Sequence, residues 1–182
     1  PTRRSSDLFS MLHKHPGQRF SVNLLPATLM QKNSAGQIIA LFQRYSVSPE
    51  LITIEVTEEQ AFSNADTSRQ NLEALRTFGC AIAIDDFGTG YSSLSYLQKL
   101  DVDTLKIDKS FVDTLEYRPL TPHIIEMAKA LNLATVAEGV ETESQRDWLR
   151  QHGVQYAQGW LYSKALPKEQ FILWAEHNLH AH

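Results

Sequence analysis

The sequence predicts an α/β protein in which a parallel β-sheet is covered on the outside by helices. Short apolar runs typical of buried strands alternate along the chain with amphipathic stretches typical of helices. No Gly-x-Gly-x-x-Gly turn follows the first run and the sequence contains no P-loop, which disfavours the doubly wound nucleotide-binding folds. We therefore expect a TIM-type (βα) barrel that is incomplete, with about six of its eight strands and without the first two.

The strands are expected at short runs rich in apolar and β-branched residues. Pro26 ends the first of these runs. The central run, from Cys80 to Ile84, has the unbroken apolar character of a strand that is buried on both faces. In chain order, the expected strands are residues 19–25, 51–56, 80–85, 104–107, 133–137 and 154–157.

The helices are expected between these runs, from apolar spacing and from the residues that begin and end helices. Asp66 is expected to be an N-cap, and Gly79 follows the end of the same helix. Pro122 suits the first turn of another helix, and Thr142 is expected to cap a third. The expected helices are the end of one at 9–15, then 36–45, 66–78, one from Ser92 or Ser93 to 100, one beginning at 121, one beginning after 142, and 168–178.

Length and composition indicate one globular domain. The 182 residues are enough to bury a hydrophobic core, and the formal net charge of -4 argues against a partner such as DNA. The single cysteine, Cys80, indicates a buried thiol in a reducing compartment and excludes an internal disulfide. No apolar run is long enough for a membrane span, so we expect no membrane contact by this segment.

The two ends of the chain are expected to lie outside the folded domain. Residues 1–8, PTRRSSDL, have the sequence that one frame of a sequencing-adapter oligonucleotide encodes, and we interpret them as a non-native leader. Residues 9–178 are then the C-terminal part of the domain, and residues 179–182 are a short tail.

Polar side chains follow every expected strand. Because the carboxyl ends of parallel strands in a βα barrel meet at one face, these side chains should converge. Carboxylate and amide oxygens without cysteine or histidine favour Mg²⁺ or Mn²⁺ over zinc, and paired acids can bridge two ions about 3.5–4 Å apart. Such a site suits hydrolysis of a phosphodiester. The strand-end residues are Asn23, Glu55, Asp85, Asp86, Lys106, Asp108, Glu138, Glu141 and Gln158.

Taken singly, each of these residues has an ordinary structural explanation. Asn23 could be a turn residue, and Lys106 could pair with Asp108. Glu55 could stand before a helix, where an acidic side chain interacts favourably with the helix dipole. Glu138 and Glu141 could be a loop acid and a helix-cap acid. The recurrence of such residues at every strand end favours the functional explanation.

Six motifs in order, VNLLP, EVTE, DDFGTGYSSL, KIDKSFV, AEGVETE and QGWLYSKALP, resemble those of the EAL domain family. This family comprises bacterial phosphodiesterases that open cyclic di-GMP to linear pGpG, and the resemblance covers residues 18–175. It implies cyclic di-GMP as the substrate, two bound Mg²⁺ or Mn²⁺ ions and a cytoplasmic location, with a parent protein that can be tethered to the inner membrane. It also allows a homodimer through the barrel of the intact protein.

The resemblance also implies a role for each site residue. Asn23, Glu55 and Asp85 correspond to ligands of one metal. Asp85 also bridges to the second metal, and Asp86 beside it is a further metal ligand and catalytic residue. Glu138 corresponds to a general base or metal ligand, Lys106 to a cation that orients the water and the phosphate, and Gln158 to a contributor to the metal and water network. Glu58 and Glu141 correspond to residues that anchor loops.

Two departures from the family pattern limit what the resemblance implies. The Glu-Ala-Leu motif that names the family is absent, and the segment from Val112 to His123 is shorter than usual. Six strands do not close an eight-strand barrel, and the strands with Asn23 and Tyr156 would be left with unpaired edges. We therefore expect the 182 residues alone to be weakly stable and almost inactive. Two alternatives stay open: a catalytically inactive receptor for cyclic di-GMP or for a protein partner, and a different metal-dependent barrel enzyme such as a lyase acting on a small acid.

Overall fold

The computed structural model describes residues 17–61, 66–88, 97, 101–115, 117 and 120–178. Within this part of the chain, six strands form one parallel sheet whose order follows the sequence from β1 to β6. The expected α/β class and parallel sheet are confirmed. The strands are β1 (Phe20–Asn23), β2 (Ile52–Thr57), β3 (Ala81–Phe87), β4 (Thr104–Ile107), β5 (Ala134–Ala137) and β6 (Tyr156–Ala157).

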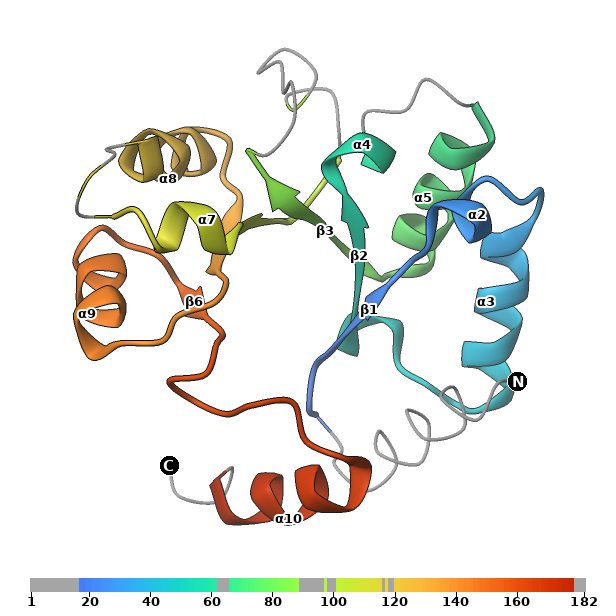
Figure 1. The fold of residues 1–182 in the computed structure, drawn as a ribbon. Helices are drawn as coiled ribbons and strands as arrows, with labels where there is room; N and C mark the ends of the chain where they lie inside the picture. Colours follow the sequence, from blue (N-terminus) through green and yellow to red (C-terminus); the bar gives the residue numbers. More distant parts are fainter. Residues whose placement is uncertain are drawn as a thin grey trace.

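The sheet is curled, and the helices lie on its outside (Figure 1). The longer helices are α3 (Ser34–Arg44), α5 (Asp66–Phe78), α8 (Leu120–Ala130), α9 (Glu143–Gln151) and α10 (Lys168–Asn178). The shorter ones are α2 (Pro26–Leu29), η1 (Pro49–Leu51), α4 (Glu58–Ala61) and α7 (Lys109–Val112). Figure 1 shows α3 and α5 on one side of the curled sheet and α7, α8 and α9 on the other.

Most expected elements match the observed ones within a few residues, with one correction and several additions. Asp66 is the first residue of α5 rather than the residue before it. The short helices α2, α4 and α7 were not expected. The leader at 1–8, the helix end at 9–15, the helix from Ser92 or Ser93 apart from residue 97, and the tail at 179–182 lie outside the described residues.

The core lies between the sheet and its helices. Ile54, Ile84, Leu105 and Ile107 are fully buried or nearly so, which is typical of parallel strands covered on both faces. Cys80 is buried and free, as expected. None of the helices in the described ranges combines the length and the apolar character that a membrane span requires.

The register of the strands brings the predicted site residues to one edge. Asn23 pairs with Glu55, Thr57 pairs with Asp85, and the last residues of β5 and β6 pair with each other. Since all the pairings are parallel, every strand delivers its carboxyl end to the same rim of the sheet. A Thr142–Gln145 capping box then begins α9 directly after the loop that follows β5.

Candidate active site

Lys106 is the centre of a charged cluster at this rim. Its side chain is 4% exposed, and Nζ lies 3.0 Å from Glu55 Oε2, 2.8 Å from Asp85 Oδ1 and 2.7 Å from Glu138 Oε1. These partners come from β2, β3 and the residue after β5, while Lys106 itself lies in β4. Four neighbouring strands therefore supply one cluster, as the strand-end pattern predicts.

The cluster holds its lysine charged. Burial acts to lower the pKa of Lys106, but its hydrogen bonds to the surrounding carboxylates together raise that pKa above the ordinary value for lysine. Burial also raises the pKa of Glu138; the contact with Lys106 opposes this rise, and the neighbouring Asp85 and Glu55 reinforce it. The site therefore contains more negative charge than its one lysine neutralises.

An irregularity in β3 explains how two adjacent aspartates reach the same site. Neighbouring residues of a regular strand point to opposite faces, so Asp85 and Asp86 would normally diverge. Here the pairing of β3 with β4 shifts register between Ile84 and Phe87, and Asp86 has a left-handed φ of 53°. Carboxylate oxygens of Asp85, Asp86 and Glu138 consequently all lie within 4.8 Å of one another.

This donor set suits a hard divalent cation. Oxygen ligands from several carboxylates are what Mg²⁺, Mn²⁺ and Ca²⁺ prefer. Burial raises the pKa of Asp86, and the negative charges of Asp85 and Asp108 add to this rise in spite of the nearby Lys106. The described residues of the cluster therefore fit the metal site that the sequence predicts.

Gln158 and Asn23 lie at the two sides of the cluster. Gln158 follows β6, and its Nε2 donates a hydrogen bond to Glu138 Oε1. Asn23 ends β1, its side chain is exposed, and the backbone N–H of the next residue, Leu24, donates to Glu55 O at 2.9 Å. Both residues are thus at the rim, and Asn23 is adjacent to Glu55 through the backbone register.

The two predicted loop-anchoring residues lie beside the cluster rather than in it. Glu58 is buried at the start of α4, and its Oε2 accepts a hydrogen bond of 2.9 Å from the N–H of Gly88, directly after β3. Glu141 accepts a hydrogen bond of 2.9 Å from Lys109 Nζ, which also contacts Asp113 at 2.9 Å. Each glutamate therefore ties a loop at the rim to a neighbouring element.

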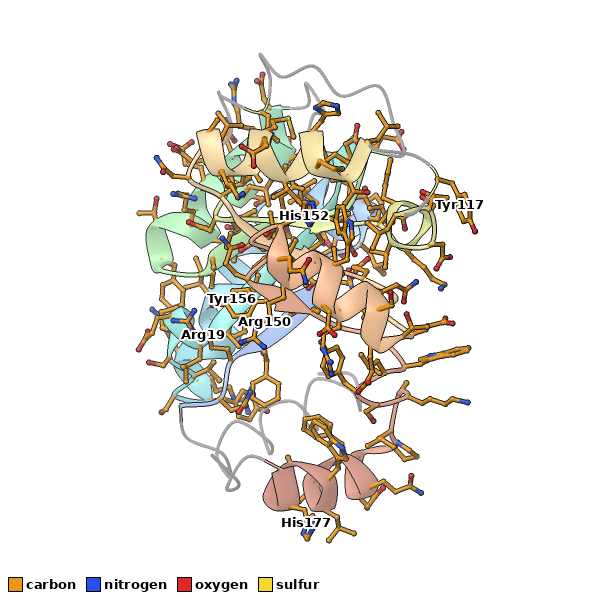
Figure 2. The ribbon with its side chains drawn as sticks, turned by 90° about the vertical axis from the view of Figure 1, so that its left-hand side faces the viewer. Arg19, Tyr117, Arg150, His152, Tyr156 and His177 are labelled. Carbon is orange, nitrogen blue, oxygen red and sulfur yellow. The ribbon has the colours of Figure 1, made fainter. Side chains whose placement is uncertain are left out.

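The histidines labelled in Figure 2 lie on the outer helices. His152 lies at the end of α9, where its ring stacks on Trp148 with ring centroids 3.6 Å apart. His177 extends from the side of α10 that faces away from the sheet (Figure 2). Neither of these two histidines is among the residues of the acidic cluster.

A cavity of about 680 Å³ opens beside Gln158 and Glu141. It is lined by several aromatic rings, among them Trp160 and Tyr162, and Lys164 Nζ lies 4.9 Å from the centre of the Trp160 ring. A volume of this size can hold a small organic molecule next to the acidic cluster.

Sequence reasoning missed two residues that the structure joins to the rim. Lys109 links α7 to the loop of Glu141, and Gln60 contacts the ends of both β1 and β2. Lys109 lies in the KIDKSFV motif three residues after Lys106, where it begins α7 and does not end a strand. For Gln60, the sequence offered only a weak signal, a glutamine three residues after Thr57, which is the spacing of a capping box at the start of a helix.

Comparisons with known proteins agree with this arrangement. The family model of the EAL domain matches residues 4–165. "Probable cyclic di-GMP phosphodiesterase PdeB" from Escherichia coli K12 is 55% identical over 173 residues, which is 95% of this chain and 33% of PdeB. The chain thus spans about a third of the length of this relative.

Solved structures give the same result. The PaMucR phosphodiesterase in its c-di-GMP complex superimposes with a TM-score of 0.84 at 36% identity, covering 92% of this chain and 70% of that chain. BlrP1 from Klebsiella pneumoniae, in a manganese/cy-diGMP complex, has a TM-score of 0.77 at 32% identity, covering 86% of this chain and 42% of that chain. With its parallel sheet, its acidic rim and a family match over most of its length, the chain belongs to the EAL domain family.

Proposed function

We propose that this chain carries the catalytic rim of a cyclic di-GMP phosphodiesterase, which hydrolyses one phosphodiester bond of its substrate to give linear pGpG. The observation that supports this most directly is the cluster of Glu55, Asp85 and Glu138 around Lys106. The phosphodiesterase names of PdeB and PaMucR support the reaction and the substrate.

The site is proposed to hold two ions of Mg²⁺ or Mn²⁺. One lysine cannot neutralise the three carboxylates that it contacts, those of Glu55, Asp85 and Glu138, so the cluster can accept further positive charge. The Asp86 carboxylate lies beside Asp85 and Glu138. Asn23 and Gln158 add amide oxygens at its two sides. Bound divalent ions would neutralise phosphate charge and lower the pKa of water. The manganese complex of BlrP1 supports this choice of metal.

The protein groups have distinct proposed tasks. Asn23, Glu55, Asp85 and Asp86 hold the metals. Glu138, whose pKa burial raises, is suited to accept a proton from the attacking water. Lys106 stays charged among its partners and can orient that water and stabilise negative charge on the phosphate oxygens.

Release of pGpG from cyclic di-GMP by the full-length protein, with Mg²⁺ or Mn²⁺ present, tests the proposal. Asp85→Asn and Glu138→Ala should each reduce turnover at least a hundredfold, because each removes a charge from the site. Glu126→Gln, an acid-to-amide change at an exposed residue of α8, is the matched control and should leave turnover unchanged. Normal turnover in the two site variants would overturn the proposal. Tight binding of cyclic di-GMP without any pGpG would instead favour a receptor.

The proposed setting of the reaction is the cytoplasm, with a parent protein that can be attached to the inner membrane through other segments. The net charge of -4 gives no support for a DNA partner. A homodimer through the barrel of the intact protein is compatible with these proposals. Light scattering by the full-length protein would test it.

A further inference from the structure

Gln60 is a buried amide side chain in the short helix α4, and the tasks proposed above do not involve it. Its residue is 8% exposed, and both ends of its amide group have partners. Oε1 accepts hydrogen bonds from Thr57 N–H at 2.7 Å and from the Thr57 hydroxyl at 3.1 Å. Nε2 donates to Leu24 O at 2.9 Å.

The two ends of the amide serve different purposes. The contacts of Oε1 with Thr57 satisfy the first turn of α4, which is a local, capping function. The contact of Nε2 with Leu24 is not local, because Leu24 belongs to the segment after β1 and lies 36 residues away in sequence. Capping alone would not require a side chain that reaches the neighbouring strand end.

The peptide that Gln60 reaches is next to a site residue. Leu24 directly follows Asn23, and the N–H of Leu24 donates to Glu55 O at 2.9 Å. Leu24 is therefore held on its N–H by the backbone of β2 and on its carbonyl by Gln60. These two bonds fix the chain direction immediately after Asn23, relative to the strand that supplies Glu55.

We infer that Gln60 is a positioning residue for the metal site: through Leu24 it fixes where Asn23 stands relative to Glu55. This inference rests on the proposed function, because it assumes that Asn23 is a metal ligand. Groups that orient ligands affect metal affinity more than they affect the reaction of the loaded site, and their loss typically weakens metal binding about 10- to 100-fold.

The test is Mn²⁺ binding by the full-length protein, followed through the electron paramagnetic resonance signal of the free ion without substrate. Gln60→Met keeps the length of the side chain and removes both functions of the amide. It should raise the dissociation constant for Mn²⁺ about tenfold. Turnover should recover most of its wild-type value at saturating Mn²⁺, which would not happen if Gln60 took part in the reaction.

Gln155 is a matched control residue, and it lies at the opposite edge of the sheet from the rim, where the strands begin. Gln155 Oε1 accepts hydrogen bonds from the N–H and the hydroxyl of Thr135 in β5, the same pair of contacts that Gln60 makes with Thr57. Gln155 lies just before β6, at the amino ends of the strands. Gln155→Met should therefore leave the dissociation constant for Mn²⁺ unchanged, and thermal unfolding of both variants would show any general loss of stability.

A double-mutant cycle separates positioning from other effects. If Gln60 acts through Asn23, adding Gln60→Met to Asn23→Ala should weaken Mn²⁺ binding no further. Fully additive effects, or unchanged Mn²⁺ binding by Gln60→Met, would overturn the inference while leaving the proposed function intact. A wild-type protein that binds no Mn²⁺ would overturn both.

Discussion

Lys106 is the residue on which the electrostatic balance of the site depends. A buried ammonium would be unfavourable alone, but here three carboxylates from different strands lie within 3.0 Å of it. The same geometry makes the carboxylates dependent on the lysine, because each is partly buried and close to the others. Loss of the ammonium should therefore affect stability as well as turnover.

Lys106→Met should lower the free energy of unfolding by about 3 kcal/mol in metal-free buffer, because partly buried carboxylates lose their shared cation. Lys129→Met is the control, since Lys129 forms a solvent-exposed pair with Glu126 and should cost less than about 1 kcal/mol. Chemical denaturation of both variants gives the comparison. Equal losses would show that the lysine at the site contributes no more than a surface lysine.

The buried thiol of Cys80 should make the folded protein less stable as the pH becomes alkaline. Burial raises the pKa of this thiol from 9.0 to about 11. Between these values, the unfolded chain releases a proton that the folded chain keeps, so the contribution of the thiol to stability is complete below pH 9 and is lost as the pH rises towards 11. The maximum loss is about 2–3 kcal/mol.

Comparison of wild type with Cys80→Ala isolates this contribution, because all other titrating groups are shared. The alanine variant should be less stable at pH 8 owing to lost packing, and the difference in free energy of unfolding should shrink by about 2 kcal/mol by pH 10.5. Urea unfolding under reducing conditions measures it. Parallel pH curves for the two proteins would contradict the prediction.

Among the elements, β5 and β6 are followed by two loops that are joined to each other through backbone hydrogen bonds. Val140 N–H donates to Gln158 O at 3.0 Å, and Leu161 N–H donates to Val140 O at 3.0 Å. This close approach depends on Gly159, where an added Cβ would lie 2.2 Å from Val140 O. The same loops carry Glu138 and Gln158.

Gly159→Ala should therefore lower stability by about 3 kcal/mol, because backbone atoms must move apart to admit the methyl group. At Gly153, a Cβ would meet the flexible end of Lys129 at 3.2 Å, so Gly153→Ala should cost about 1 kcal/mol, mainly from its positive φ of 85°. Thermal unfolding and pGpG release of both variants test this. Turnover should be lost in the first and kept in the second.

The elements also show where prediction from sequence stops. The strands were predicted because buried parallel strands are continuous apolar runs, and the site residues were predicted because they follow those runs. The four-residue helices have too little sequence to give a periodic signal. The contact of Gln60 in α4 with Leu24 was also not predictable, because the two residues are 36 positions apart in sequence. The register shift at Asp85 and Asp86 could not be predicted either. In a regular strand the side chains alternate between the two faces, so adjacent residues are expected to point in opposite directions.

At the scale of the whole molecule, the sheet has two outer strands. Among the described residues, β1 pairs with β2 and β6 pairs with β5, each at one end of the strand order. Edge strands with unsatisfied backbone groups lower stability and favour association. The chain covers about a third of the length of its relative PdeB. Any further segment that pairs with β1 or β6 would cover these edges.

The full-length protein should accordingly be more stable than the 182 residues alone, and should release pGpG where the shorter chain gives almost none. Thermal unfolding and turnover, measured for both proteins at the same concentration and with the same metal, make the comparison. Equal turnover would show that the described rim needs no further segment.

The sequential order of the strands also governs how the site appears during synthesis on the ribosome. Lys106 is synthesised 51 residues after Glu55, and Glu138 is synthesised later still, directly after β5. A nascent chain therefore has an incompletely paired ammonium until that strand leaves the exit tunnel and docks. The complete cluster can therefore form only after the chain from β2 to the residue that follows β5 has been made.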